Sequence, residues 1–301
     1  MIDQLRPSTA RFLKDIETIT RRMERAQEQI TSGLKISNAS DAPDQISSLL
    51  QLRSELNQNE QIRNNLARLK TEVDAAEKAV QSGVKIVDRA LVLGTQGANG
   101  TLSAETRMHI SNEIGSLLQM LVGLSQATVD GRYIFSGDAD ATPPYSLDFG
   151  NSPPLSPYAG APATRQMMHP NGTLFSVSKT AQEIFDGPNP GQSVFAAMDA
   201  LRVALANDDS AAILAGIDEL REAATYLNVQ LAFYGTVQNQ VAEAQEFSQN
   251  LELRLRANLA SLEEADLTEA ILELQQSRFQ LDAALTSRAQ LPRTSLFDYL
   301  R

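Results

Sequence analysis

The chain has 301 residues, a net charge of −11, no cysteine, no tryptophan and only two histidines. These counts exclude a disulfide framework and a zinc site built from about four His and Cys ligands. The acidic balance argues against a nucleic-acid partner, which needs a clustered excess of Lys and Arg. The first residues lack the apolar core of a signal peptide, and no stretch approaches the roughly 20 apolar residues of a membrane span. We therefore expect no membrane partner.

The first predicted element is an amphipathic helix over residues 2–30. Its apolar positions alternate steps of three and four residues, which is the 3.5-residue repeat of a coiled coil. Pro7 fits only near the start of such a helix. The repeat consists of Ile2, Leu5, Thr9, Phe12, Ile16, Ile19, Met23, Ala26 and Ile30. An ordinary amphipathic helix on a globular core would show the same spacing, so the repeat alone leaves both alternatives open.

A long helix follows, which the sequence predicts to begin at residues 40–43 and to end near residue 93. Serine and aspartate favour the cap, and proline favours the first turn. The apolar seam of this helix is interrupted by Asn59, Arg63, Lys70 and Glu77. A third helix is predicted over residues 103–128 from helical spacing of apolar residues.

Proline distribution marks an insert in the middle of the chain. Nine of the 12 prolines lie between Pro143 and Pro190, whereas residues 44–142 and 191–291 contain none. Proline breaks helix interiors, so the insert reads as turns and short strands. A strand over residues 131–135 would lead into it, with Tyr133 and Phe135 packed on the helices. We expect a small β-rich domain that projects into solvent and makes few contacts with the helices, the alternative being a disordered loop.

The C-terminal arm is predicted to contain a second long helix over residues 210–263 and a terminal helix with 3.5-residue spacing over residues 267–285. The two long helices have similar lengths and run out from and back to the terminal segments, so they should be antiparallel. The expected fold is therefore mainly α: a long antiparallel helical rod, or coiled-coil bundle, with terminal helices and a small β-rich insert. Its predicted domains are 1–42 with 266–301, 43–136 with 192–265, and 137–191.

Sites for catalysis or metal binding are not indicated by the sequence. His109 and His169 have no motif around them, and Gly94, Gly97 and Gly100 lack the Lys-Ser/Thr of a phosphate loop. The acidic residues at 263, 264, 266 and 269 could bind a cation, but a helix cap before Leu267 is the better interpretation. We predict no enzymatic activity, no catalytic residue, no cofactor and no metal.

Three segments resemble the flagellin superfamily. Residues 31–43, TSGLKISNASDAP, resemble the family segment between the terminal helix and the rod, although Ala42 stands where a second aspartate is common. Residues 131–137, GRYIFSG, and residues 262–270, LEEADLTEA, followed by SLFDYL at 295–300, are similar to the hook–filament junction proteins, the hook-associated protein 3 group. The likeness covers both helical arms, and the insert carries no recognisable motif.

This resemblance implies a structural subunit of the bacterial flagellum that joins hook to filament. It also implies export through the flagellar type III system to an extracellular location. The implied partners are the hook-side hook-associated protein, filament flagellin, further copies of the chain and an export chaperone. Two alternatives remain: filament flagellin itself, and a cytoplasmic coiled-coil signalling module.

The terminal helices are predicted to carry the subunit contacts. The expected assembly residues are Leu5, Phe12, Ile16, Ile19, Met23, Ile30, Leu267, Ile271, Leu274, Leu281, Leu285, Leu296 and Phe297.

Overall fold

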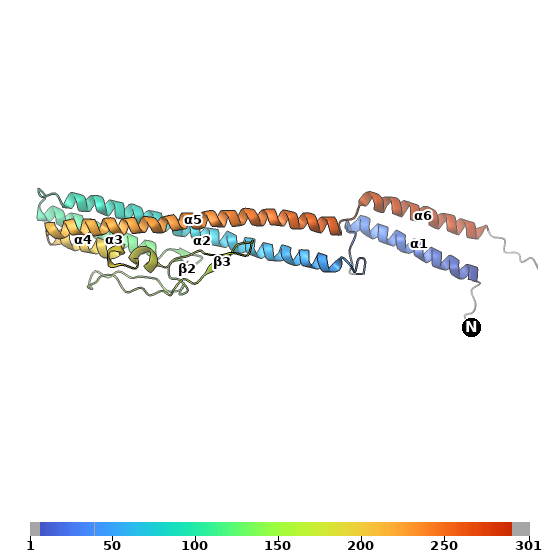
Figure 1. The fold of residues 1–301 in the computed structure, drawn as a ribbon, viewed down its shortest axis with the longest axis horizontal. Coiled ribbons are helices and arrows are strands. Elements are labelled where there is room, and N and C mark those ends of the chain that lie inside the picture. Colours follow the sequence, from blue (N-terminus) through green and yellow to red (C-terminus); the bar gives the residue numbers. More distant parts are fainter. Residues whose placement is uncertain (1–6, 39, 291–301) are drawn as a thin grey trace, which may run out of the picture. The chain divides into compact units, whose positions relative to one another are not determined.

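The computed structural model describes residues 7–38 and 40–290 and is mainly helical, as predicted (Figure 1). Its α-helices are α1 (Pro7–Ser32), α2 (Ile46–Gly97), α3 (Ala104–Ser125), α4 (Val194–Ala206), α5 (Ser210–Glu263) and α6 (Leu267–Ala289). A π-helix, η1 (Gln182–Asp186), and a 3₁₀ turn, η2 (Pro190–Gln192), precede α4. The chain divides into two compact units, residues 1–58 with 251–301 and residues 59–250.

In the larger unit, α2 and α5 are antiparallel. Residue numbers increase along α2 while those of the contacting residues in α5 decrease. The contacts that show this are Asn59 with Ser248, Asp74 with Gln238, and Gly94 with Ile217. The predicted seams are buried: Leu66 and Val80 of α2 and Leu220 and Leu227 of α5 are fully shielded from solvent. Spacing and the absence of proline therefore identified both long helices, and α2 continues a few residues beyond the predicted end.

Two small antiparallel sheets interrupt the helices. Strands β1 (Thr128–Val129) and β2 (Arg132–Tyr133) form a hairpin in which Thr128 pairs with Tyr133. The turn residues Asp130 and Gly131 both have positive φ, which suits the twist of a tight hairpin. Strands β3 (Gln166–Met168) and β4 (Leu174–Ser176) pair with each other. The predicted strand over 131–135 is thus shorter, and most of the insert is irregular.

The expectation that the insert makes few contacts with the helices is wrong. Phe135 is fully buried, with its ring 6.1 Å from Phe185 and 6.4 Å from Tyr234 of α5. Tyr145 and Ile184 belong to the same hydrophobic core as the helices. Large aromatic side chains bury much apolar surface, so these residues bind the insert firmly to the helices. Phe135 packs on the helices as predicted, while Tyr133 is half-buried.

The sequence reasoning also missed helix α4. Ser193 caps it by accepting a hydrogen bond from the amide of Ala196 at 3.2 Å. The helix packs against α3 and contributes Met198 and Leu201 to the core, where both are fully buried. Its apolar residues lie all round the helix, so hydrophobic periodicity is weak and the helix is hard to recognise from spacing.

In the smaller unit, α1 and α6 form an antiparallel pair. Arg288 donates a hydrogen bond to Thr9 Oγ1 at 2.8 Å, and its guanidinium lies over the ring of Phe12. The segments that follow α1 and precede α6 pair through two backbone hydrogen bonds, from Lys35 to Glu263 and from Ala265 to Gly33. No helix in the part of the chain that the structure describes is long and apolar enough to cross a membrane.

Candidate assembly surface

A compact loop joins α1 to α2 and is built from the motif at residues 31–43. Gly33 ends α1 with a φ of 72°, a conformation that glycine adopts without strain. The Asp41 carboxylate accepts hydrogen bonds from the amides of Asn38 at 2.7 Å and Ser37 at 3.1 Å. These hydrogen bonds, chiefly that from Asn38, lower the pKa of Asp41. The predicted start of the long helix at residues 40–43 is therefore wrong: this segment forms a turn, and α2 begins at Ile46.

The acidic residues between α5 and α6 have structural partners. Glu263 is almost completely buried and pairs with Arg53 of α2. Asp266 caps α6 by accepting hydrogen bonds from the amides of Thr268 at 2.8 Å and Glu269 at 3.2 Å, as predicted. Within the described ranges no group of three or more His, Asp or Glu side chains could hold a metal ion.

The predicted assembly residues of α1 lie on its partly covered side. Within the described part of α1 only Ala26 is fully buried, at 2% exposure. The remaining predicted positions are half-buried: Phe12, Ile16, Ile19, Met23 and Ile30. Leu5 lies outside the described residues, as do Leu296 and Phe297.

On α6 the predicted residues fall partly away from the buried side. Ala270 and Ser277 are buried, at 3% and 1% exposure, while Leu274 and Leu281 are half-buried. In contrast, Leu267, Ile271 and Leu285 are exposed. Small side chains at the contact let two helices approach closely, so the larger apolar residues remain at the edge.

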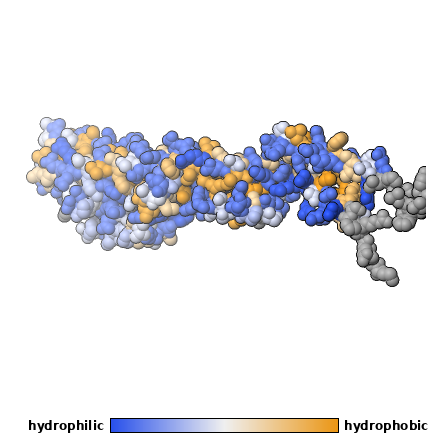
Figure 2. Space-filling model, turned by 45° about the vertical axis from the view of Figure 1, so that its right-hand side comes forward, coloured by the Kyte–Doolittle hydropathy of each residue, from blue (hydrophilic) through white to orange (hydrophobic). Residues whose placement is uncertain are grey.

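Further exposed apolar residues, which the spacing analysis missed, extend this surface. Phe279 is 76% exposed and Leu272 is 60% exposed, and Leu13 of α1 is exposed as well. Hydrophobic residues are visible at the surface of this helix pair in Figure 2. We call Leu13, Leu267, Ile271, Leu272, Phe279 and Leu285 the terminal apolar surface. Large apolar side chains exposed on several sides of one helix pair indicate protein association, and their signal in the sequence was an excess of Leu, Ile and Phe beyond one helical stripe.

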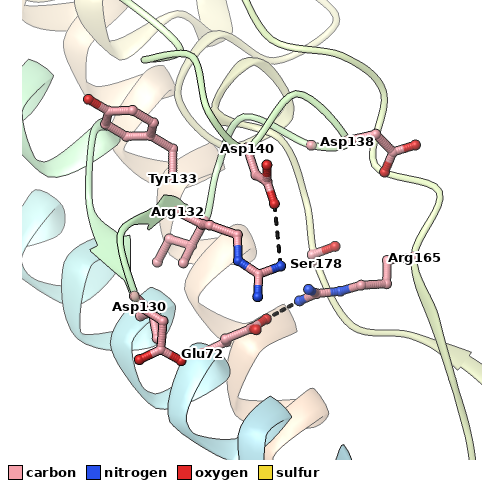
Figure 3. A pocket seen from close by; sticks show the side chains of 11 residues that line it. Glu72, Asp130, Arg132, Tyr133, Asp138, Asp140, Arg165 and Ser178 are labelled. Carbon is pink, nitrogen blue, oxygen red and sulfur yellow. Dashed lines mark hydrogen bonds and ion pairs between the residues drawn. The ribbon is translucent and has the colours of Figure 1, made fainter.

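A charged pocket of about 260 Å³ lies between α2 and the insert (Figure 3). Glu72 of α2 pairs with Arg165, and Arg132 approaches Asp140 at 3.5 Å. Asp138 accepts a hydrogen bond from the hydroxyl of Thr164 at 2.7 Å. The Glu72–Arg165 pair therefore links α2 to the insert across this pocket.

The two histidines lie away from this pocket. His109 is exposed on α3, and the ring of His169 lies 5.4 Å from that of Phe247. Among the described residues, neither histidine forms a hydrogen bond with the side chain of a serine, threonine or tyrosine.

Two family models match the chain. The bacterial flagellin N-terminal helical region matches residues 8–140, and the bacterial flagellin C-terminal helical region matches residues 217–300. Flagellar hook-associated protein 3 of Escherichia coli (strain K12) is 30% identical over 162 residues, which cover 53% of this chain and 49% of that protein. The flagellar filament 33 kDa core protein of Treponema phagedenis is 28% identical over 116 residues, which cover 38% and 41%. The chain thus spans half or less of the length of these two relatives.

The fold has solved counterparts. A Vibrio parahaemolyticus protein assigned as a flagellar hook-associated protein superimposes with a TM-score of 0.66 at 22% identity, covering 75% of this chain and 100% of the other. At this identity the likeness concerns the fold. The regions matched by the two family models include nearly all of α1, α2, α3, α5 and α6. More than half of the chain thus consists of flagellin helical regions, and the chain belongs to the flagellin superfamily.

Proposed function

We propose that the chain is a structural subunit of the bacterial flagellum that forms the junction between hook and filament. The observation that carries the proposal is the terminal apolar surface. It lies on α1, which the N-terminal flagellin region matches, and on α6, which the C-terminal region matches. Phe279 and Leu272 are exposed to water on this helix pair, so covering them with another subunit lowers the free energy. The similarity to a hook-associated protein 3 favours the junction over other places in the flagellum.

The half-buried residues of α1 and α6 complete the proposed interface. Phe12, Ile16, Ile19 and Met23 of α1 would become fully buried when subunits pack, together with Leu274 and Leu281 of α6. A head-to-tail contact that does not close on itself generates a helical array, the symmetry that a tubular structure needs. The proposed partners are therefore further copies of the chain, a hook-side hook-associated protein and filament flagellin.

The proposed route to this location is the flagellar type III system, which delivers the chain outside the cell. An export chaperone would hold the chain before delivery. The absence of cysteine suits passage as an unfolded chain, because no thiol can cross-link on the way.

A double variant tests the assignment. In a deletion strain, Ile271→Asp with Phe279→Asp should be exported but should not restore filaments, because each buried carboxylate would lack a partner. The matched control is Leu174→Asp with Val229→Asp, two exposed apolar residues of the larger unit, which should restore filaments. Normal filaments with the first double variant would contradict the proposed interface.

Filament flagellin is the second candidate, since the chain also resembles a filament core protein. Immunogold labelling separates the two. Junction subunits give one spot at the base of each filament, whereas filament subunits give label along its whole length.

A further inference from the structure

An apolar pocket of about 320 Å³ opens beside α4 in the larger unit. Its walls come from the proline-containing stretch of the insert, from α3 and from α4. The apolar lining consists of Leu118, Pro153, Pro154, Leu155, Phe195, Ala196 and Ala200. Against this lining stand only three polar side chains, those of Asp186, Ser193 and Asp199.

Asp186 is held in place by neutral groups. One carboxylate oxygen accepts a hydrogen bond from the Tyr145 hydroxyl, and the other accepts one from Ser193 Oγ at 2.7 Å. Among the described residues no Lys, Arg or His forms an ion pair with it. A carboxylate offers about four acceptor positions, so Asp186 retains capacity for a cation. Asp199 differs, because it pairs with Arg202 at 2.7 Å.

The outer side of α4 extends the apolar surface of the pocket. Asp199 and Arg202 are the only charged residues of this helix, and they neutralise each other. Ala196, Ala200 and Val203 are exposed at helical spacing of four and three residues. A helix that is apolar all round is normally buried, and here one side of it faces water.

We propose that this pocket is a docking site for a segment of another protein that presents an arginine or lysine beside apolar residues. The aliphatic part of the side chain would lie against Pro154 and Phe195, and its cationic end would reach Asp186. The occupant is a basic segment of another protein, because the net charge of −11 on this chain adds long-range attraction for a basic partner. The proposal does not rest on the flagellar assignment.

Fluorescence anisotropy of a labelled acetyl-Gly-Leu-Arg-Leu-Gly-amide peptide tests it, with the full-length protein as titrant. The same peptide with glutamate in place of arginine is the ligand control. We expect saturable binding of the arginine peptide and an affinity at least about tenfold lower for the glutamate peptide. Equal binding of the two peptides, or no binding of either, would overturn the proposal.

Three variants locate the site. Asp186→Asn removes the negative charge of the pocket. Ala200→Phe fills the pocket from an exposed position without changing a core residue. Each variant should weaken binding of the arginine peptide by about tenfold or more. Asp218→Asn removes an exposed charge of α5 elsewhere and should leave affinity unchanged. If Asp186→Asn alters the circular dichroism spectrum, Ala200→Phe decides, and unchanged binding by that variant rejects the pocket. If Ala200→Phe abolishes self-association of the protein in sedimentation experiments, the pocket binds a second copy, and the choice of partner is contradicted.

Discussion

Asn59 of α2 and Ser248 of α5 satisfy each other's hydrogen bonds in the buried contact between the two long helices. The Asn59 amide donates to the Ser248 carbonyl at 2.9 Å, and the Ser248 hydroxyl donates to Asn59 Oδ1 at 2.8 Å. Both residues are almost completely buried. A buried polar pair costs free energy in any register that separates its members, so this pair selects one alignment of α2 and α5.

Asn59→Ala should therefore lower the free energy of unfolding by about 1–3 kcal/mol, because the Ser248 hydroxyl loses its acceptor in a buried place. Ser248→Ala and the double variant complete a thermodynamic cycle, measured by urea unfolding. We expect the double variant to be more stable than the sum of the single effects implies. Additive losses would show that the two side chains act independently.

Acid should loosen the loop between α1 and α2. The folded-state pKa of Asp41 is lowered, chiefly by the Asn38 amide, so the ionised carboxylate stabilises the folded loop. This contribution is present above the unfolded-state pKa of about 4 and is lost as the pH falls through the lower folded-state value.

Hydrogen exchange of the amides of Ser37 and Asn38 measures this change, after correction for the intrinsic pH dependence of exchange. Asp41→Asn should abolish the additional pH dependence, while Asp218→Asn should preserve it. A wild-type loop whose protection is unaffected by acid would contradict the role of the carboxylate.

The two glycines of the segment 131–137 should respond differently to substitution. A Cβ at Gly137 would lie 1.9 Å from the carbonyl oxygen of Ala161, and φ there is +62°. Gly137→Ala should lower the free energy of unfolding by about 3 kcal/mol or more, because backbone must move.

Gly131 also has a positive φ, of +77°, but nothing lies within 4 Å of its added Cβ. Gly131→Asn should cost about 1 kcal/mol or less, since asparagine tolerates this conformation. Thermal unfolding of both variants measures the difference. Equal losses would show that the close approach to Ala161 relaxes without cost.

Deletion of residues 140–189 should prevent the larger unit from reaching its native stability. The deletion removes Tyr145, Ile184 and Phe185, which are buried in the core shared with the helices. Phe185→Ala alone should cost about 3–5 kcal/mol by leaving a cavity. Limited proteolysis and thermal unfolding compare these variants with Leu174→Ala, which truncates an exposed side chain of the insert. Native-like stability of the deleted chain would show that the helices form their core alone.

The sequence by itself determined the long helices and several of their ends. The absence of proline over about 100 residues on each side of the insert, with coiled-coil spacing of Leu and Val, is sufficient to identify α2 and α5. Asp266 marked the start of α6 because its side chain accepts hydrogen bonds from local amides, an interaction that needs no tertiary partner.

Only the tertiary structure decided which sides of these elements are covered. Spacing placed Leu267, Ile271 and Leu285 on an apolar stripe of α6, yet Ala270 and Ser277 are the buried residues. Small residues contribute little hydropathy but allow close approach, so the contact between α1 and α6 has a weak sequence signal. The insert shows the same limit: Phe135 and Tyr145 are far from Phe185 in the sequence, and their common core with α5 depends on contacts that local patterns do not encode.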